Sequence, residues 1–460
     1  MPFSTALIDA LLAIFPTDAF ATDDATRAAY AYDNSRRSAL PDAVAFPTSH
    51  EQAVALVAAC RAHRVPLIAR GRGTNTTGAT VPDSGGVVAS FERMNRILAI
   101  EPGNRIAIVE PGVLNADLQR ALKEHGLFWP PDPTSAPYCS VGGNLACNAG
   151  GPRAVKYGAT RDNVLGLRVV AGNGRDFRCG THTTKGSVGY DLTRFIIGSE
   201  GTLALITEAA LKLTPKPDAV RTLRAAYRDV ESAADAVARI MAQPLTPSAL
   251  EFMDDAALEL ARAQGGDAPA HAGALLLIEV DGAAAALDAA AAAVETAARV
   301  DGLIEWRAAR DAAETAALWN ARKALSPALR TISPDKINED VVVPVSRVPE
   351  LIARLRELAR RFDLPIVSFG HAGNGNLHVN LLPRDAAERE RAHACLREVF
   401  AAVIEFDGTL SGEHGIGTAK RDFIAQAVDV GALATMREIK RVFDPDGILN
   451  PGKLLPAVAD

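Results

Sequence analysis

The chain has 460 residues, more than one ordinary domain holds, so we expect two or three domains. Its net charge is −6 with acidic and basic residues interspersed, which argues against nucleic acid as a partner. Five scattered cysteines without a C-x-x-C pair favour a reduced setting, and no run approaches the ~20 apolar residues of a membrane span. We therefore expect a cytoplasmic protein without a signal peptide; peripheral association with the inner membrane stays open.

From Val44 to about Thr214, short β-rich runs alternate with segments of helical spacing. Residues 1–35 are expected to be helical and peripheral. The expected strands are 65–69, 105–109, 164–170 and 203–207, and the expected helices are 51–63 and 114–125. The clearest linker in the chain is the segment 214–217, which reads Thr-Pro-Lys-Pro.

After this linker the pattern predicts an α+β layer structure in which helices cover one sheet. The expected strands are 222–227, 249–253, 274–280, 341–344 and 365–369, and the expected helices are 230–242, 256–262 and 283–299. Arg322 lies late in a further helix that ends before Pro334.

The segment 371–378, His-Ala-Gly-Asn-Gly-Asn-Leu-His, predicts a β-hairpin. An Asn-Gly pair between strand-like residues favours a two-residue type I′ turn, here at Asn374 and Gly375. In that register His371 lies directly opposite His378, and Asn380 projects from the same face. Two imidazoles so placed can share one metal ion, although an ordinary pair of hydrogen-bonding histidines is the alternative.

A second cluster, at 411–417, sets Glu413 and His414 among three glycines. Two histidines and one carboxylate form a common site for a catalytic divalent ion, and zinc, manganese and iron all suit this set. The donors would be His371, His378 and Glu413, which leaves His414 free for proton transfer.

Three glycine-rich segments have the composition of loops that bind phosphate through main-chain N–H groups: 70–78, 130–151 and 198–203. Together they indicate an extended ligand that carries a diphosphate. The dinucleotide fingerprint G-x-G-x-x-G fails in the first loop, where Thr76 replaces the third glycine, so a Rossmann site is disfavoured.

This order of loops resembles the flavoproteins of the vanillyl-alcohol oxidase and p-cresol methylhydroxylase fold family. The C-terminal motifs at 370–378, 411–417 and 449–453 resemble its D-lactate and D-2-hydroxyglutarate dehydrogenase branch. The resemblance implies an α+β fold with a two-part FAD-binding domain, an α+β substrate (cap) domain with an antiparallel sheet, and a C-terminal helical segment. The corresponding ranges are 1–217 with an N-terminal arm at 1–35, then 218–408, and 409–460, which returns to the flavin site.

The resemblance also implies roles for individual residues. His371, His378 and Glu413 would bind the metal, His414 would be the catalytic base, and Arg322 and Asn380 would contact substrate. The residues implied in FAD binding are Arg70, Gly71, Gly73, Thr74, Asn75, Pro131, Asp132, Ser140, Gly143, Asn144, Asn148, Gly150, Gly201, Ile206 and Asn450. Thr74 stands about where some members carry a histidine bonded to FAD, so noncovalent FAD is expected.

The expected reaction is oxidation of a D-2-hydroxy acid to the 2-oxo acid by hydride transfer to flavin N5. D-lactate is the first choice of substrate, D-2-hydroxyglutarate the second and glycolate the third. With glycolate as substrate, the chain would be a glycolate oxidase subunit. A quinone, a cytochrome or an electron-transfer flavoprotein would accept the electrons, and a homodimer is compatible with the sequence. Two other classes stay open: a metal-dependent hydrolase of a nucleotide-like ligand, and a non-catalytic flavin-binding subunit.

Overall fold

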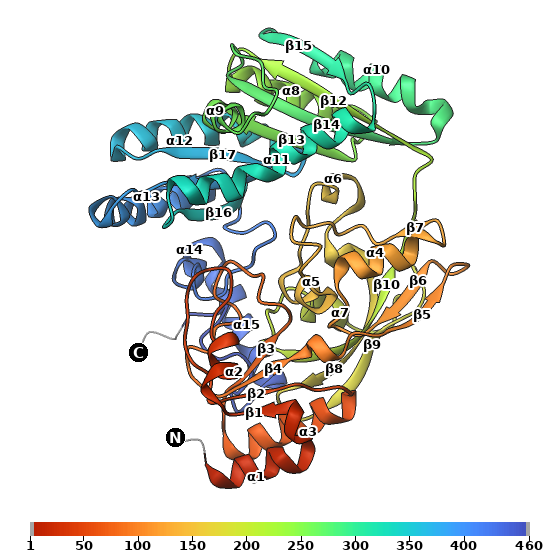
Figure 1. The fold of residues 1–460 in the computed structure, drawn as a ribbon, viewed down its shortest axis with the longest axis vertical. Helices are drawn as coiled ribbons and strands as arrows, with labels where there is room; N and C mark the ends of the chain where they lie inside the picture. Colours follow the sequence, from red (N-terminus) through yellow and green to blue (C-terminus); the bar gives the residue numbers. More distant parts are fainter. Residues whose placement is uncertain (1–3, 457–460) are drawn as a thin grey trace. The chain divides into compact units, whose positions relative to one another are not determined.

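The computed structural model describes residues 4–456 (Figure 1). The chain divides into two compact units. The first comprises residues 1–150, 158–216 and 413–460, and the second comprises 151–157 and 217–412.

The first unit opens with a four-stranded sheet in the order β1-β2-β4-β3, in which the pairs β2/β4 and β4/β3 are parallel. Its elements are α1 (Thr5–Ile14), β1 (Phe20–Ala21), α2 (Asp24–Ala29), β2 (Ala43–Ala45), α3 (His50–His63), β3 (Leu67–Arg70) and β4 (Val87–Ser90). Leu7 and Leu11 of α1 are fully buried in the core of this sheet. The N-terminal segment contains the expected helix, and one apolar face of this helix α1 packs on α3.

A five-stranded antiparallel sheet follows, in the order β5-β6-β10-β8-β9. The elements around it are β5 (Ile97–Glu101), β6 (Ile106–Val109), α4 (Asn115–Lys123), β7 (Leu127–Phe128), α5 (Val141–Cys147), β8 (Val164–Ala171), β9 (Asp176–Gly180), α7 (Leu192–Ile196), β10 (Ala204–Lys212) and β11 (Thr214–Pro215). The C-terminal helices α14 (Ile424–Ala427) and α15 (Val430–Phe443) complete this unit. After them, Leu449 forms a parallel bridge to Leu67 of β3, which returns the chain to the first sheet.

The second unit is built on a seven-stranded antiparallel sheet in the order β15-β12-β14-β13-β17-β18-β16. Its strands are β12 (Ala219–Tyr227), β13 (Ala249–Asp254), β14 (Ala274–Gly282), β15 (Leu303–Ala308), β16 (Ile337–Val342), β17 (Ile366–His371) and β18 (Asn376–Leu381). The antiparallel sheet expected for the cap domain is thus confirmed. The short helix α6 (Ala154–Tyr157) also belongs to this unit, where the Tyr157 hydroxyl donates to Asp281 at 2.7 Å.

Two groups of helices pack on this sheet (Figure 1). One group contains α8 (Val230–Ala242), α10 (Leu287–Ala298), α12 (Val348–Phe362) and α13 (Ala386–Glu405). The other contains α9 (Asp255–Ala263) and α11 (Ala312–Ile332), whose apolar side chains share a core with Val367 and Phe369 of β17. Arg322 is therefore carried by a helix that lies on the same face of the sheet as alternate residues of β17.

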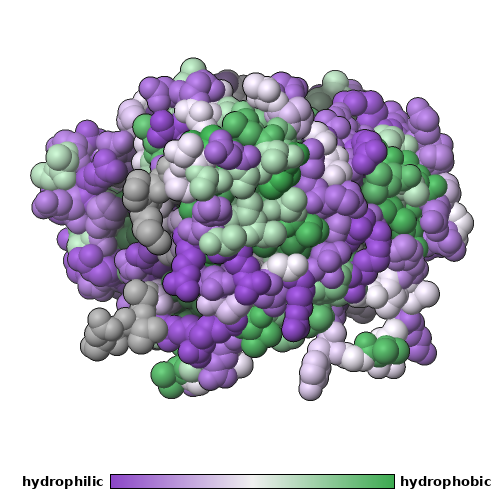
Figure 2. Space-filling view, turned by 90° about the horizontal axis from the view of Figure 1, so that it is seen from below, coloured by the Kyte–Doolittle hydropathy of each residue, from purple (hydrophilic) through white to green (hydrophobic). Residues whose placement is uncertain are grey.

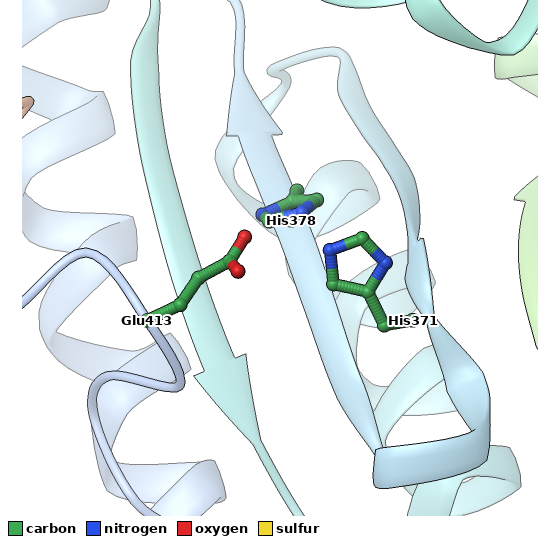
Figure 3. Close-up of side chains that lie close together, drawn as sticks. All are labelled: His371, His378 and Glu413. Carbon is green, nitrogen blue, oxygen red and sulfur yellow. The ribbon is translucent and has the colours of Figure 1, made fainter. Parts of the chain in front are cut away.

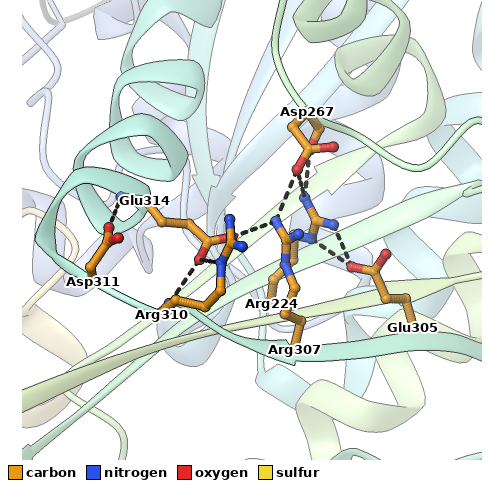
Figure 4. A network of polar contacts seen from close by, with 7 residues as sticks. All are labelled: Arg224, Asp267, Glu305, Arg307, Arg310, Asp311 and Glu314. Atoms are coloured by element: carbon orange, nitrogen blue, oxygen red, sulfur yellow. Dashed lines mark hydrogen bonds and ion pairs between the residues drawn. The ribbon is translucent and has the colours of Figure 1, made fainter.

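An ion-pair network fixes the start of α11 (Figure 4). Arg224 of β12 is 2% exposed and contacts both Asp267 and Glu305. Arg307 bridges Asp267 and Glu314 at 2.9 Å each, and Glu314 in turn accepts from the main-chain N–H of Arg310. This network holds α11, and hence Arg322, in a defined position on the sheet.

No helix within residues 4–456 is both long and apolar enough to cross a bilayer. Figure 2, which views the molecule from below, shows polar side chains interspersed with apolar ones on that face.

Candidate active site

The hairpin forms, but its register differs from the one that the Asn-Gly pair predicts. His371 lies opposite Asn376, and His378 lies opposite Phe369, because residues 372–375 make a four-residue connection that begins with a 3-10 turn. The prediction of a two-residue turn with His371 directly opposite His378 is therefore wrong. The two histidines still share a face, since a shift of two residues preserves the alternation of side chains along a strand. They are diagonal neighbours, with ring centroids 5.1 Å apart.

The structure brings the three expected metal donors together (Figure 3). One donor atom from each of His371, His378 and Glu413 lies within 4.8 Å of the other two. Both histidines are buried. Two imidazole nitrogens and one carboxylate oxygen at this spacing are the chemistry that a divalent transition metal prefers, so the residues fit a metal ion.

Asp340 positions Glu413, although no motif in the sequence singles this residue out. Asp340 lies on β16 directly opposite His378 and is fully buried. Its carboxylate accepts from the main-chain N–H of Gly412 at 2.8 Å and from the Ser411 hydroxyl at 3.2 Å. Glu413 is the next residue in the chain. The strand β16, which pairs with β18, therefore also fixes the main chain just before Glu413.

Glu251 is a second residue of the site that the sequence motifs do not indicate. It lies on β13 opposite His371, and its Oε1 is 2.5 Å from His371 Nδ1. Its Oε2 is 2.7 Å from Arg322, whose guanidinium also lies 4.6 Å from the centre of the Phe369 ring. Burial raises the pKa of Glu251, but the charges of His371 and Arg322 outweigh burial and hold that pKa below its usual value. A charged residue inside the otherwise apolar run 249–253 was the available signal.

Asn380 points to the same face, as expected, and is fully buried. Its Oδ1 accepts from Lys336 Nζ at 3.2 Å, and its Nδ2 donates to the main-chain carbonyl of Val367. Lys336 also donates to the Ser326 hydroxyl at 3.2 Å. A lysine beside a buried amide on this face was not anticipated, and the sequence held no motif that singled it out.

In the first unit, two of the glycine-rich loops meet at the start of α5. A Cβ atom on Gly71 would lie 2.5 Å from Ser140 Oγ and 3.5 Å from the main-chain nitrogen of Gly143. Ser140 caps α5 and accepts from Gly143 at 3.3 Å. Only glycine allows this close approach. The main-chain N–H groups at the start of α5 then lie beside the first loop, where they can donate to the oxygens of a diphosphate.

Asn450 and Gly201 connect the C-terminal strand-like segment to the same loops. Asn450 Nδ2 donates to the carbonyls of Ala79 and Glu200, while its Oδ1 is buried without a partner among the described residues. A Cβ atom on Gly201 would lie 3.1 Å from the Cβ of Ala69. A buried acceptor at this junction fits a ligand that supplies a donor there, as the flavin ring does.

Several other residues that we expect to bind FAD use their side chains for contacts within the protein. Arg70 donates to the Tyr32 carbonyl at 2.7 Å, and Asn144 is buried against Asn115 and Cys139. The side chain of Ile206 belongs to the core of the five-stranded sheet. Further bonds join the loops of other expected residues. The Asp132 N–H donates to the Gly150 carbonyl, Asn148 Oδ1 accepts from the main-chain N–H of Arg161, and the Pro131 carbonyl accepts from Asn115 Nδ2. Gly73 adopts a positive φ of 65° and Thr74 is half-buried beside it.

The loop that carries His414 is anchored by Glu200. The buried carboxylate of Glu200 accepts from the main-chain N–H groups of Ile416 and Gly417 at 2.6 and 2.7 Å. Burial raises the pKa of Glu200 to about 7, against the opposing effect of these two donors. A Cβ atom on Gly415 would lie 2.7 Å from this carboxylate, so glycine is required for the close contact.

Two family models together match most of the chain. The FAD binding domain matches residues 41–180, and the C-terminal domain of FAD linked oxidases matches residues 216–454. The chain belongs to the FAD-linked oxidase family. It is thus an FAD-linked oxidoreductase, which agrees with the resemblance that the motifs indicate and disfavours the metal-dependent hydrolase.

Relatives with curated names agree with this assignment. Glycolate oxidase subunit GlcD of Bacillus subtilis (strain 168) is 39% identical over 449 residues, covering 96% of this chain and 95% of the relative. D-lactate dehydrogenase of Anaerostipes hadrus is 36% identical and covers 90% of both chains. D-2-hydroxyglutarate dehydrogenase of Stutzerimonas stutzeri (strain A1501) is 34% identical, covering 98% of this chain and 99% of the relative.

The fold matches solved flavoenzymes. The structure of p-cresol methylhydroxylase with substrate bound superposes with a TM-score of 0.82 at 18% identity, covering 98% of this chain and 96% of that one. The expected p-cresol methylhydroxylase type of fold is therefore confirmed.

Proposed function

We propose that this FAD-linked oxidoreductase is a metal-dependent dehydrogenase of small 2-hydroxy acids, with D-lactate as the first choice of substrate. The observation that carries the proposal is the cluster of His371, His378 and Glu413 within 4.8 Å, with His414 next in the chain. A hydroxy acid offers a carboxylate and a neighbouring hydroxyl, which together chelate a divalent ion.

FAD, when bound, supplies a two-electron hydride acceptor, and a divalent ion at the three donors supplies Lewis acidity toward the substrate hydroxyl. The side chains of the protein bind and orient the substrate and accept its proton. His414 takes the hydroxyl proton as general base, a step commonly worth ~10²–10⁴ in rate. Gly71, Ser140 and Gly143 hold the noncovalent FAD through their loop and helix start.

Arg322 and Asn380 orient the substrate in this proposal. Arg322 Nη2 lies 2.7 Å from Glu251 Oε2, so this nitrogen pairs with the protein's own carboxylate. The Nε of Arg322 is buried without a partner among the described residues and can donate to the substrate in this proposal. Lys336, beside Asn380, adds a positive charge for the carboxylate.

A glycolate oxidase subunit is the second candidate, favoured by the 39% identity to GlcD over nearly the whole chain. In that case the chain would need other subunits to pass electrons onward. D-2-hydroxyglutarate is the third substrate to consider, because a relative of that name is matched end to end. A quinone, a cytochrome or an electron-transfer flavoprotein would serve as acceptor in each case.

The test is an anaerobic visible spectrum of the purified protein before and after addition of each acid. Bleaching of the flavin band by D-lactate and not by L-lactate is the expected result. Bleaching by glycolate or by D-2-hydroxyglutarate alone would reassign the substrate. A flavin band that no 2-hydroxy acid bleaches would refute the proposal while leaving the family assignment intact.

A further inference from the structure

Glu251, His371 and Arg322 form a buried chain of contacts on one face of the seven-stranded sheet. Glu251 and His371 are directly paired across β13 and β17, so their side chains leave the same face. The Glu251 side chain is 1% exposed, and its two oxygens have different partners, His371 Nδ1 at 2.5 Å and Arg322 at 2.7 Å.

An ionised carboxylate only accepts hydrogen bonds, so the bond between Glu251 and His371 requires a proton on His371 Nδ1. The lone pair of a neutral imidazole then resides on Nε2. We propose that Glu251 is a positioning residue that fixes this tautomer and ring orientation, so that His371 presents Nε2 to the metal ion. The inference rests on the metal site of the proposed function.

Arg322 acts on His371 through Glu251. Its guanidinium offsets the buried carboxylate, which would otherwise be an uncompensated charge. Arg322 is itself fixed, because it stacks on Phe369 and is carried by the anchored helix α11. The Glu251 carboxylate is therefore held against His371. Nε2 is then the metal-binding nitrogen of His371 already in the metal-free protein.

Glu251→Gln tests this relation without a large change in volume. An amide has one acceptor, and Arg322 competes for it. If the amide carbonyl turns to Arg322, its NH₂ faces His371 Nδ1 and selects the opposite tautomer, with the proton on Nε2. Loss of such a carboxylate partner typically costs 10–100-fold in metal affinity, so we expect the Kd for Zn²⁺ and for Mn²⁺ to rise by about that factor.

Glu279→Gln is the matched control. Glu279 is also a buried glutamate of this sheet, on the neighbouring strand β14, and it accepts from Trp319 Nε1 at 2.6 Å and the Thr222 hydroxyl at 3.0 Å. Both donors are neutral, so an amide oxygen can replace the carboxylate there. We expect this variant to bind Zn²⁺ and Mn²⁺ as the wild type does.

The measurement is a chelator-competition titration with Zn²⁺ or Mn²⁺ on the full chain loaded with FAD, together with the FAD content and the Tm of each variant. The expected result is a raised Kd in Glu251→Gln at unchanged FAD content. A merely structural role would lower the Tm and leave the Kd of the folded protein unchanged, which would overturn the inference.

Two further outcomes keep the inference separate from the proposed function. If the wild type binds neither ion, the metal site and the inference both fail. If His371→Ala abolishes binding while Glu251→Gln does not weaken it, the inference alone fails. Should Glu251→Gln not fold, Glu251→Asp retains the charge beside Arg322 and withdraws the carboxylate from His371 by one methylene. This variant must then show a raised Kd for Zn²⁺ and Mn²⁺, and a wild-type Kd would contradict the inference.

Discussion

Asn75 Nδ2 donates a hydrogen bond of 2.9 Å to the main-chain carbonyl of His414. The same amide group lies 3.3 Å from Cys147 Sγ, at the end of α5, and Asn75 Oδ1 accepts from the N–H of Thr77. One side chain in the first glycine-rich loop therefore links that loop, the helix α5 and the segment that carries the expected base. The loop expected to bind FAD and the residue expected to move the proton are positioned together.

Asn75→Ala should reduce turnover and weaken FAD binding in the same variant. The loss of this partly buried hydrogen bond costs about 1 kcal/mol or more, because the carbonyl of His414 loses the Asn75 donor. We expect a Kd for FAD raised several-fold and a lowered kcat, measured by flavin fluorescence and by anaerobic flavin reduction. Asn104→Ala, which removes an exposed amide that bonds Glu101, is the control and should match the wild type.

His414→Asn should abolish most turnover and leave FAD bound. Removal of a general base commonly costs ~10²–10⁴ in rate, while the loops that hold FAD keep their contacts. Stopped-flow reduction of the flavin by substrate gives the rate, and the visible spectrum gives the FAD content. His125→Asn, at an exposed position, serves as control. A His414→Asn protein that keeps most of its kcat would remove His414 from the role of base.

His371→Ala should strip the metal without unfolding the chain. The site loses one of three donors, whereas the sheet hydrogen bonds of β17 belong to the main chain and persist. Elemental analysis of the purified variant should find metal far below one ion per chain, with the Tm within a few degrees of the wild type. The exposed His271→Ala should retain its metal. Undiminished metal in His371→Ala would contradict the ligand assignment.

Asp340→Ala should weaken metal binding although Asp340 is not itself one of the three donors. Its carboxylate fixes Gly412 and Ser411, which precede Glu413, so its loss lets the Glu413 segment move. We expect a metal Kd raised about tenfold and unchanged FAD content, by chelator competition. Asp288→Ala removes an exposed carboxylate of the same unit and should change neither quantity. An unaltered Kd in Asp340→Ala would show that Glu413 is held by other contacts.

Asp254 should make stability depend on pH between about 4 and 7. Burial raises its pKa from 3.8 to about 7, although it accepts from the N–H groups of Ala257 and Ser368. The folded state then binds the proton more tightly than the unfolded state, so the free energy of unfolding falls as pH rises through this window. At about 1.4 kcal/mol per pKa unit the loss is at most about 4 kcal/mol.

Asp254→Asn should remove this dependence. The Tm advantage of the wild type over the variant should therefore be largest near pH 5 and should shrink toward pH 8, as measured by thermal unfolding across that range. Asp288→Asn, at an exposed position, should parallel the wild type at every pH. A Tm difference that stays constant with pH would show that Asp254 is ionised throughout the range, and one that grows with pH would show that folding lowers its pKa.

Local pattern predicted many of the strands and helices in their correct order, but it did not predict β2, β4, β5, β9 or β15. The strands β3, β6, β8 and β17 begin within two residues of the expected positions, and α8 matches its expected range. The period of two also placed His371, His378 and Asn380 on one face, and this survived the wrong register because the error was an even number of residues. Local pattern does not predict that α1 packs on α3, because this contact depends on a second helix.

Tertiary structure decided which distant residues complete the site. Glu251 lies 120 positions from His371 in the chain, and Asp340 lies on a strand that pairs with β18 only because of the sheet order β13-β17-β18-β16. Alternation fixes which face a side chain leaves, but it carries no information about which strand is the neighbour. That choice follows from the collective burial of the strands and of the helices that cover them, so Glu251, Asp340 and the partner of Arg322 emerge only in the folded chain.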